Sequence, residues 1–268
     1  MKVAWLTDVH LNFLLAADTD RFLRRLRQAE PEAVFLTGDI AESHNVIDYL
    51  AKFDAAMPCP TYFVLGNHDF YYGSIAEVRS KVTEFCRERE NLIYLTANDV
   101  IELPGRDGEP VALLGHDGWA DGRIGDYEKS LVMMNDYQLI AELVKLDKRS
   151  RLEVLHRLGD EAGAEIDRKL LTALRDYQEV IVLTHVPPLR EACWYDGELS
   201  DDQWAPHFTC KAAGQALLAA AGAHRDRQIT VYCGHTHGRG ECYPRPNLTI
   251  FTGAAEYGKP EIERVWEM

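Results

Sequence analysis

Several features are missing from this sequence, and each absence excludes a class of protein. Its 268 residues contain no run approaching the roughly 20 apolar residues that span a bilayer, and the apolar start, Met1–Thr7, is too short for a signal peptide. Few basic side chains, 29 Lys and Arg against 43 Asp and Glu for a net charge of −14, disfavour binding of nucleic acid by phosphate neutralisation. The six cysteines form no CxxC pair. We expect a soluble, acidic, cytoplasmic protein with reduced thiols and no membrane partner.

Internal repeats, low-complexity tracts and linkers are absent as well. The composition that remains is typical of a folded chain, because 46% hydrophobic and 27% charged residues exclude intrinsic disorder. At about 150 residues per domain, the length allows one or two domains. We expect a single domain over residues 1–268 that carries insertions.

Apolar runs rich in Val, Ile, Leu, Phe and Tyr are too short for helices and predict buried strands. They are Lys2–Leu6, Ala33–Leu36, Thr61–Leu65, Val111–Leu114, Val180–Leu183, Ile229–Tyr232 and Leu248–Phe251. Between the first of these runs, helical spacing of apolar residues recurs over Thr19–Glu30, Asn45–Ala55 and Ser74–Glu90. The alternation predicts an α/β fold with a mainly parallel sheet.

The middle of the chain has a different character. Residues 126–177 contain no proline and keep helical spacing, with one break at Gly159–Gly163, so we expect a helical insertion of two or three helices. A Trp- and Asp-rich loop follows Pro187–Pro188 and is long for a connection. We expect the insertion and this loop, residues 186–210, to lie on the substrate side and to set specificity.

Polar side chains of metal-binding types follow five of the predicted strands. They are Asp8, His10, Asp39, Asn67, His68, Asp69, His185, His235 and His237. Ligand crevices in α/β sheets form at the carboxyl ends of strands. Polar residues after a single strand would more often form only a turn. Such residues after five buried strands, which we call strand tips, indicate a shared site. His235 and His237 alternate along the chain, so a turn has to bring them together.

The types of donor in this set predict a metal site. Imidazoles and carboxylates with one amide and no thiolate suit Zn, Mn, Fe, Co or Ni. Even seven donors out of these nine residues are too many for one tetrahedral ion and suit two divalent ions that share a bridging carboxylate, an arrangement that serves phosphoryl transfer. The glycines before three of the tips, Gly38, Gly66 and Gly234, would let the backbone approach the metal closely.

Five sequence blocks resemble, in order, those of the calcineurin-like metallophosphoesterase family: DVH (8–10), GD (38–39), GNHD (66–69), TH (184–185) and GHTH (234–237). The resemblance implies a two-sheet β-sandwich flanked by helices, with a dinuclear site at the strand tips. It implies that one ion takes Asp8, His10 and His237, that the other takes Asn67, His185 and His235, and that Asp39 bridges them. It also implies that His68 faces the substrate without binding metal, oriented by Asp69.

The expected reaction is hydrolysis of a phosphomonoester or phosphodiester, a small phosphate ester, by a hydroxide held between the two ions. His68 would assist the leaving group, and the charge of Asp69 would raise the pKa of His68. A nuclease of the same family is an alternative that the acidic charge disfavours. An inactive interaction scaffold is disfavoured because no block lacks a ligand, and a structural metal site would be closed by four ligands, often cysteines. His116, Asn12 and Arg190 have no role that the sequence specifies.

Overall fold

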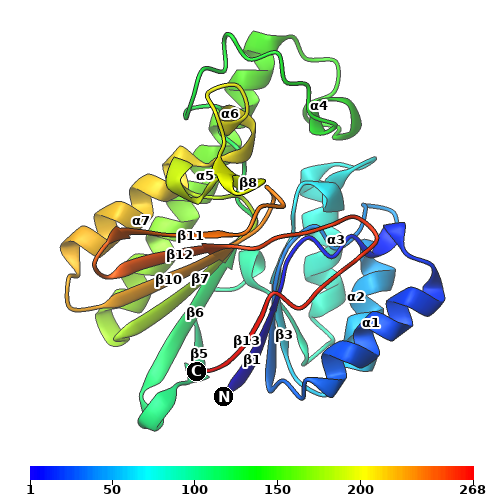
Figure 1. Cartoon of the computed structure of the whole chain (residues 1–268), viewed down its shortest axis with the longest axis vertical. Coiled ribbons are helices and arrows are strands. Elements are labelled where there is room, and N and C mark those ends of the chain that lie inside the picture. Colours follow the sequence, from blue (N-terminus) through cyan, green and yellow to red (C-terminus); the bar gives the residue numbers. More distant parts are fainter.

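Two β-sheets packed face to face form the centre of the molecule (Figure 1). The computed structural model describes residues 1–268, with the side chain of residue 107 excepted. The first sheet consists, in spatial order, of β13 (Arg264–Glu267), β1 (Lys2–Leu6), β2 (Ala33–Thr37), β3 (Thr61–Val64) and β4 (Leu92–Tyr94). The second consists of β11 (Gly240–Arg245), β12 (Leu248–Thr252), β10 (Gln228–Cys233), β7 (Glu179–Thr184), β6 (Pro110–His116) and β5 (Ile101–Pro104). Pairing is parallel except at the outer strands β13, β11 and β5.

Helices cover the outer face of each sheet (Figure 1). The first sheet carries α1 (Ala16–Gln28), α2 (Val46–Ala56) and α3 (Ile75–Cys86), and the second carries α5 (Lys148–Asp176) and α7 (Lys211–Ala223). No helix of the described residues is long and apolar enough to cross a membrane. The expected two-sheet sandwich flanked by helices is confirmed.

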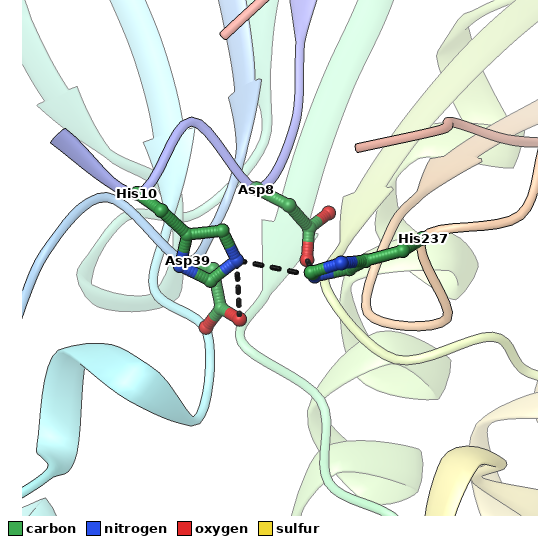
Figure 2. Close-up of side chains that lie close together, drawn as sticks. All are labelled: Asp8, His10, Asp39 and His237. Carbon is green, nitrogen blue, oxygen red and sulfur yellow. Dashed lines mark hydrogen bonds and ion pairs between the residues drawn. The ribbon is translucent and has the colours of Figure 1, made fainter. Parts of the chain in front are cut away.

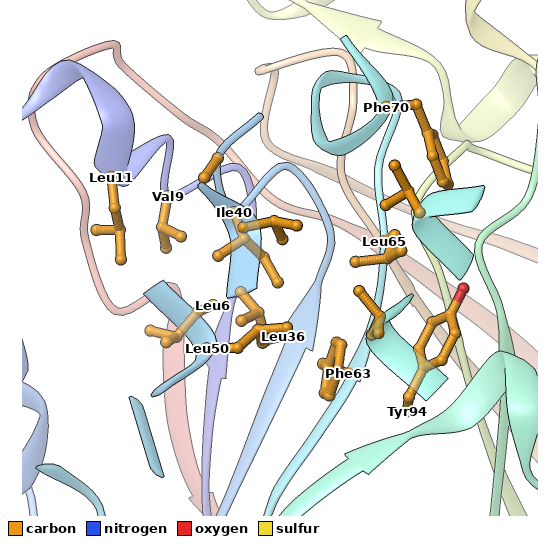
Figure 3. Close-up of a cluster of buried hydrophobic side chains, with 14 of the residues drawn as sticks. Leu6, Val9, Leu11, Leu36, Ile40, Leu50, Phe63, Leu65, Phe70 and Tyr94 are labelled. Carbon is orange, nitrogen blue, oxygen red and sulfur yellow. The ribbon is translucent and has the colours of Figure 1, made fainter. Parts of the chain in front are cut away.

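Successive side chains along each strand point to opposite faces of the sheet, and apolar side chains cover both faces. In β1, Trp5 lies in the cluster between the two sheets, whereas Leu6 lies in the cluster beneath the helices. Figure 3 shows that second cluster, in which Leu36 of β2 and Phe63 of β3 lie close to Leu50 of α2. Strands buried on both faces read as continuous apolar runs, which explains why the central strands are visible in the sequence.

The long helix α5 corrects one expectation. Gly159 and Gly163 do not break it, and the helix runs without interruption through both residues. A Cβ at Gly159 would lie 2.4 Å from the Cβ of Asp121, and one at Gly163 would lie 2.9 Å from Ala212. These glycines therefore serve close packing of α5 against its neighbours, not an end to the helix.

Two segments lie beyond the carboxyl ends of the strands and together form what we call the cap, residues 126–147 and 186–210 (Figure 1). The first contains the short helix α4 (Asp136–Leu139), and the second contains α6 (Ala205–Phe208) and a hairpin of β8 (Trp194–Tyr195) and β9 (Glu198–Leu199). The buried ring of His207 joins the two segments, since its nitrogens contact the hydroxyls of Ser130 and Tyr137.

Candidate metal centre

Loops that leave strands of both sheets meet at one end of the sandwich. From the first sheet come Asp8 and His10 after β1, Asp39 after β2 and Asn67 after β3, and from the second come His185 after β7 and His235 and His237 after β10. Six of these side chains are buried and His237 is half-buried. The structure thus brings together all seven residues predicted to bind metal.

The backbone turns sharply at these positions. Asp8, His10, Asp39, His235 and His237 all adopt positive φ, between 41° and 70°. Such a conformation costs a residue other than glycine about 1–3 kcal/mol and persists only where surrounding contacts impose it. Through this turn His235 and His237, which would face opposite ways on an extended chain, both point into the site.

Glycines next to the candidate ligands leave no room for a side chain. A Cβ at Gly66 would lie 2.2 Å from Asp39 Oδ1, and one at Gly234 would lie 2.0 Å from Asp8 Oδ2. Gly38 has a φ of 89°, and its Cβ would lie 2.7 Å from His185 Nδ1. These glycines therefore leave room for the side chains of Asp8, Asp39 and His185 beside the backbone.

Four side chains form the first group of donors, which is drawn in Figure 2. Ligand atoms of Asp8, His10, Asp39 and His237 all lie within 4.8 Å of one another. His10 Nε2 lies 3.1 Å from His237 Nε2 and 3.7 Å from Asp39 Oδ2, and His237 Nε2 lies 3.5 Å from Asp8 Oδ1. Two imidazoles and two carboxylates thus converge on one point.

Asn67, His185 and His235 form the second group. His185 donates from Nδ1 to the carbonyl of Thr37 at 2.8 Å, so its Nε2 keeps the lone pair, 3.0 Å from Asn67 Oδ1. His235 donates from Nε2 to the carbonyl of His207 at 3.2 Å, which leaves Nδ1 as its donor atom. Asp39 touches both groups, because its Oδ1 lies 3.4 Å from His185 Nε2 while its Oδ2 faces His10.

The electrostatics of the site favour a bound cation. Burial raises the pKa of Asp39 well above its ordinary value, and the charges of Asp8 and Asp69 raise it further. Burial lowers the pKa of His10 to about 2 and that of His235 to about 3, with neighbouring histidines adding to both shifts. Neutral imidazoles and a carboxylate that lacks a counter-charge are the donors that divalent metal ions prefer. The residues therefore fit divalent ions.

Comparison with known proteins agrees with this geometry. The model of the calcineurin-like phosphoesterase family matches residues 1–239. The chain belongs to this family. It is therefore a metal-dependent phosphoester hydrolase, as the sequence predicted.

Individual relatives of this phosphoesterase are distant. A protein of Campylobacter jejuni, described as an uncharacterized metallophosphoesterase, is 27% identical over 104 residues, which span 35% of this chain and only 25% of that protein. Phosphopantetheinyl hydrolase from Mycobacterium tuberculosis superposes with a TM-score of 0.66 at 15% identity, over 96% of this chain and 89% of that one. A dimetal phosphatase from Danio rerio superposes with a TM-score of 0.57 at 17% identity, over 97% and 89% of the two chains. These structural likenesses show the fold.

Asp69 corrects an expectation about the phosphoesterase site. Its buried carboxylate does not orient the ring of His68 in any described contact, because it accepts hydrogen bonds from the backbone N–H groups of Ile40 at 3.0 Å, Ala41 at 2.8 Å and Gly66 at 2.8 Å. Asp69 therefore ties the loop after β2 to the loop after β3. Nor is the pKa of His68 raised, since burial lowers it to about 3.

The ring of His68 borders the site without lying in either group. It lies against Tyr71, with ring centroids 4.2 Å apart, and its Nε2 is 3.4 Å from the hydroxyl of Tyr257. Its Nδ1 is buried and has no hydrogen-bond partner among the described residues.

Sequence reasoning missed the residues that support the second group. Buried Asp136, in α4, accepts hydrogen bonds from Asn67 Nδ2 and from the hydroxyl of Tyr71, both at 2.8 Å. The sequence also gives no role to His207, whose carbonyl accepts a hydrogen bond from His235. Neither residue belongs to a motif, so only the fold reveals them.

Two residues for which the sequence specified no role, His116 and Arg190, make structural contacts. Buried His116 accepts a hydrogen bond from the backbone N–H of Gly118 at 3.0 Å, and its neighbour Asp117 accepts one from Leu65 N at 2.8 Å and so holds the end of β3. Arg190 pairs with Asp202 within the cap, so its charge is already compensated.

A pocket of about 830 Å³ opens over the candidate metal centre. Asp39, Asn67, His68, His235 and His237 lie at its floor, and the cap supplies much of its wall. Most side chains of that wall are apolar or acidic, and two are uncharged and polar: Met133, Met134, Tyr195, Leu199, Trp204, Phe208, Asp196, Glu198, Asp201, Asn135 and Ser200. No lysine or arginine is among the described residues that line it.

Proposed function

We propose that this phosphoesterase binds two divalent ions and hydrolyses a small phosphomonoester or phosphodiester. The first ion would be held by Asp8, His10 and His237, the second by Asn67, His185 and His235, with Asp39 between them. The observation that carries the proposal is the placement of Asp39, whose two carboxylate oxygens face different donor groups. Mn, Fe, Zn, Ni and Co all accept this combination of imidazole, carboxylate and amide donors.

The bound ions would supply Lewis acidity, which lowers the pKa of a water and compensates charge on the phosphoryl oxygens. The neighbouring glycines leave room for the carboxylates of Asp8 and Asp39, which would hold these ions. His68 would act at the leaving group, since it borders the pocket and the two donor groups do not use its ring. A neutral imidazole retains one N–H that can donate to a departing oxygen.

The pocket supports a small substrate in preference to a polynucleotide. Its acidic wall and the net charge of −14 repel a polyanion, and its lining contains no described lysine or arginine to offset phosphates distant from the centre. The nuclease and scaffold readings are therefore not favoured by any observation of the site.

We also infer a reducing, cytoplasmic compartment. All six cysteines are free, and four of them are buried. Thiols persist in this state where glutathione and thioredoxin keep them reduced.

Metal titration tests the proposal. Protein stripped of metal should be inactive toward phosphate esters and should take up two equivalents of Mn²⁺ or Zn²⁺ as activity returns. Asp39→Asn should lower the binding affinity for both ions by about 10-fold or more, because the lost charge faces both donor groups. Asn67→Ala should lower mainly the binding affinity for the second ion. Full activity without metal, or Asp39→Asn with two ions at wild-type affinity, would contradict the assignment.

A further inference from the structure

The amide of Asn67 is held in one orientation by the cap. Its Nδ2 donates to Asp136 at 2.8 Å and to the hydroxyl of Tyr71 at 3.1 Å, and that hydroxyl itself donates to Asp136. With both amide hydrogens on one side, Oδ1 faces His185 Nε2 at 3.0 Å. Asp136 lies 69 positions along the chain from Asn67 and is buried, so this contact is a tertiary feature of the cap.

The orientation of His235 also depends on the cap. Its Nε2–H donates to the backbone carbonyl of His207, and this bond leaves Nδ1 as the metal-binding atom. The position of that carbonyl is set by the buried ring of His207, which contacts the hydroxyl of Tyr137 at one nitrogen and that of Ser130 at the other. Both hydroxyls come from the first cap segment, so the two segments together determine where the carbonyl lies.

The first donor group lacks such support from the cap. Asp8 accepts from the backbone N–H of His235 at 3.1 Å and from the hydroxyl of Thr7, both on loops at the strand ends. Among the described residues, no hydrogen bond joins the cap to Asp8, His10 or His237. The two donor groups therefore differ in which part of the fold orients them.

We propose that the cap positions the ligands of the second ion, with Asp136 acting through Asn67 and His207 acting through His235. The first ion is independent of the cap. This inference rests on the proposed function, because it requires two ions. Asp136 and His207 are positioning residues, since each acts through a candidate ligand and neither is a donor in either group.

The test is a calorimetric titration of metal-free protein with Mn²⁺. Asp136→Asn keeps the shape of the side chain but replaces the charged acceptor of the Asn67 and Tyr71 hydrogen bonds by a weaker, neutral one, so one ion should bind 10–100-fold more weakly while the other stays within about twofold of wild type. The weakened ion should be the one that Asn67→Ala also loses. Glu142→Gln is the matched control, because Glu142 joins the same cap segment to Ser74 of the first half of the chain at 2.7 Å without touching the site.

Tyr137→Phe tests the second contact without removing a buried ring. It deletes the hydroxyl that contacts His207, so the binding affinity for the same ion should fall, by a smaller factor than in Asp136→Asn. The electron paramagnetic resonance of the Mn²⁺-loaded protein gives an independent readout. Both variants at about one equivalent of added metal should show only the signal of isolated Mn²⁺, with the coupled pair returning only at excess metal.

Two results overturn the inference while leaving the proposed function intact. Both ions could weaken equally in Asp136→Asn, or both could bind as in wild type. A wild-type protein that takes up fewer than two ions overturns the proposed function and this inference with it. Thermal unfolding of the metal-free variants within a few degrees of wild type separates a positioning effect from a loss of fold.

Discussion

At the scale of single residues, the candidate ligands are distinguished by what else each side chain contacts. His185 and His235 each commit one ring nitrogen to a backbone carbonyl, which fixes the tautomer and the atom left for metal. His10 has no such partner, and its Nδ1 is buried and unpaired among the described residues. Its orientation depends instead on packing against Tyr257, with ring centroids 4.5 Å apart.

The role of His68 can be separated from that of a ligand by one substitution. His68→Asn should leave the metal content near that of wild type, because the ring contributes to neither donor group. It should lower kcat by about 10²–10³-fold on an alkyl phosphate, because the charge that develops on its alkoxide loses the hydrogen bond that the neutral ring of His68 donates. An aryl ester such as p-nitrophenyl phosphate should lose less. Steady-state kinetics on the two esters, with metal analysis of the same samples, measure both effects.

His185→Ala is the matched comparison, since it removes a proposed ligand 3.0 Å from Asn67 Oδ1. It should lose metal and slow both esters together. The assignment of His68 is wrong if His68→Asn itself loses an ion, or if alkyl and aryl esters slow by the same factor while chemistry limits the rate.

At the scale of elements, the sequence predicts what is local and misses what depends on distant neighbours. The seven predicted strands all exist, because strands between two apolar layers are apolar throughout. The edge strand β13 is mostly exposed and exists through its pairing with β1, more than 250 residues away along the chain. The helix α7 consists largely of alanine and glycine, so it shows little contrast between an apolar and a polar face.

The same division applies to the site. The donors could be predicted because each follows a buried strand within a few residues. Asp136 and His207 could not, because no local pattern distinguishes a buried aspartate or histidine of the cap from an exposed one. Asp69 was predicted as part of the site but with the wrong partner, since a sequence does not show that three backbone amides surround its carboxylate.

The small residues of α7 have two different functions, and a pair of alanine substitutions separates them. A Cβ at Gly214 would lie 2.1 Å from the backbone carbonyl of Pro188, which cannot move aside. Gly214→Ala should therefore lower the free energy of unfolding by about 1–3 kcal/mol. At Gly222 a Cβ would lie 3.6 Å from Arg245, an ordinary contact, so Gly222→Ala should raise it by up to about 1 kcal/mol. Urea unfolding of metal-free protein measures both, and equal effects at the two positions would contradict the packing argument.

At the scale of the whole molecule, folding stability should fall in mild acid. Burial lowers the pKa of His207 to about 4, and the charges of Arg151 and Lys148 lower it further. The folded state therefore keeps His207 neutral at pH values where the unfolded chain already protonates it, since a histidine in an unfolded chain has a pKa of about 6.5. This contribution to stability is complete above pH 6.5 and is lost as the pH falls toward 4, amounting to about 2 kcal/mol between pH 7 and pH 5.

Urea unfolding with a chelator present, repeated from pH 7.5 to pH 5, measures this effect. His207→Gln removes the titrating ring, so the unfolding free energy of the variant should depend less steeply on pH, by up to one proton or about 1.4 kcal/mol per pH unit. His44→Gln, on the surface, is the control. A variant with the same pH dependence as wild type would show that His207 is not protonated on unfolding.

The meeting of loops from two sheets has a consequence for the order of folding. Each proposed ion takes ligands from both: Asp8 and His10 with His237 for one, and Asn67 with His185 and His235 for the other. A chain with only one sheet formed offers neither ion a complete set of ligands. Complete binding of either proposed ion would therefore require that the two sheets have docked. Interactions that form only after the folding transition state slow unfolding and leave the folding rate unchanged, so ions bound at that stage would determine how long the folded protein lasts, not how quickly it forms.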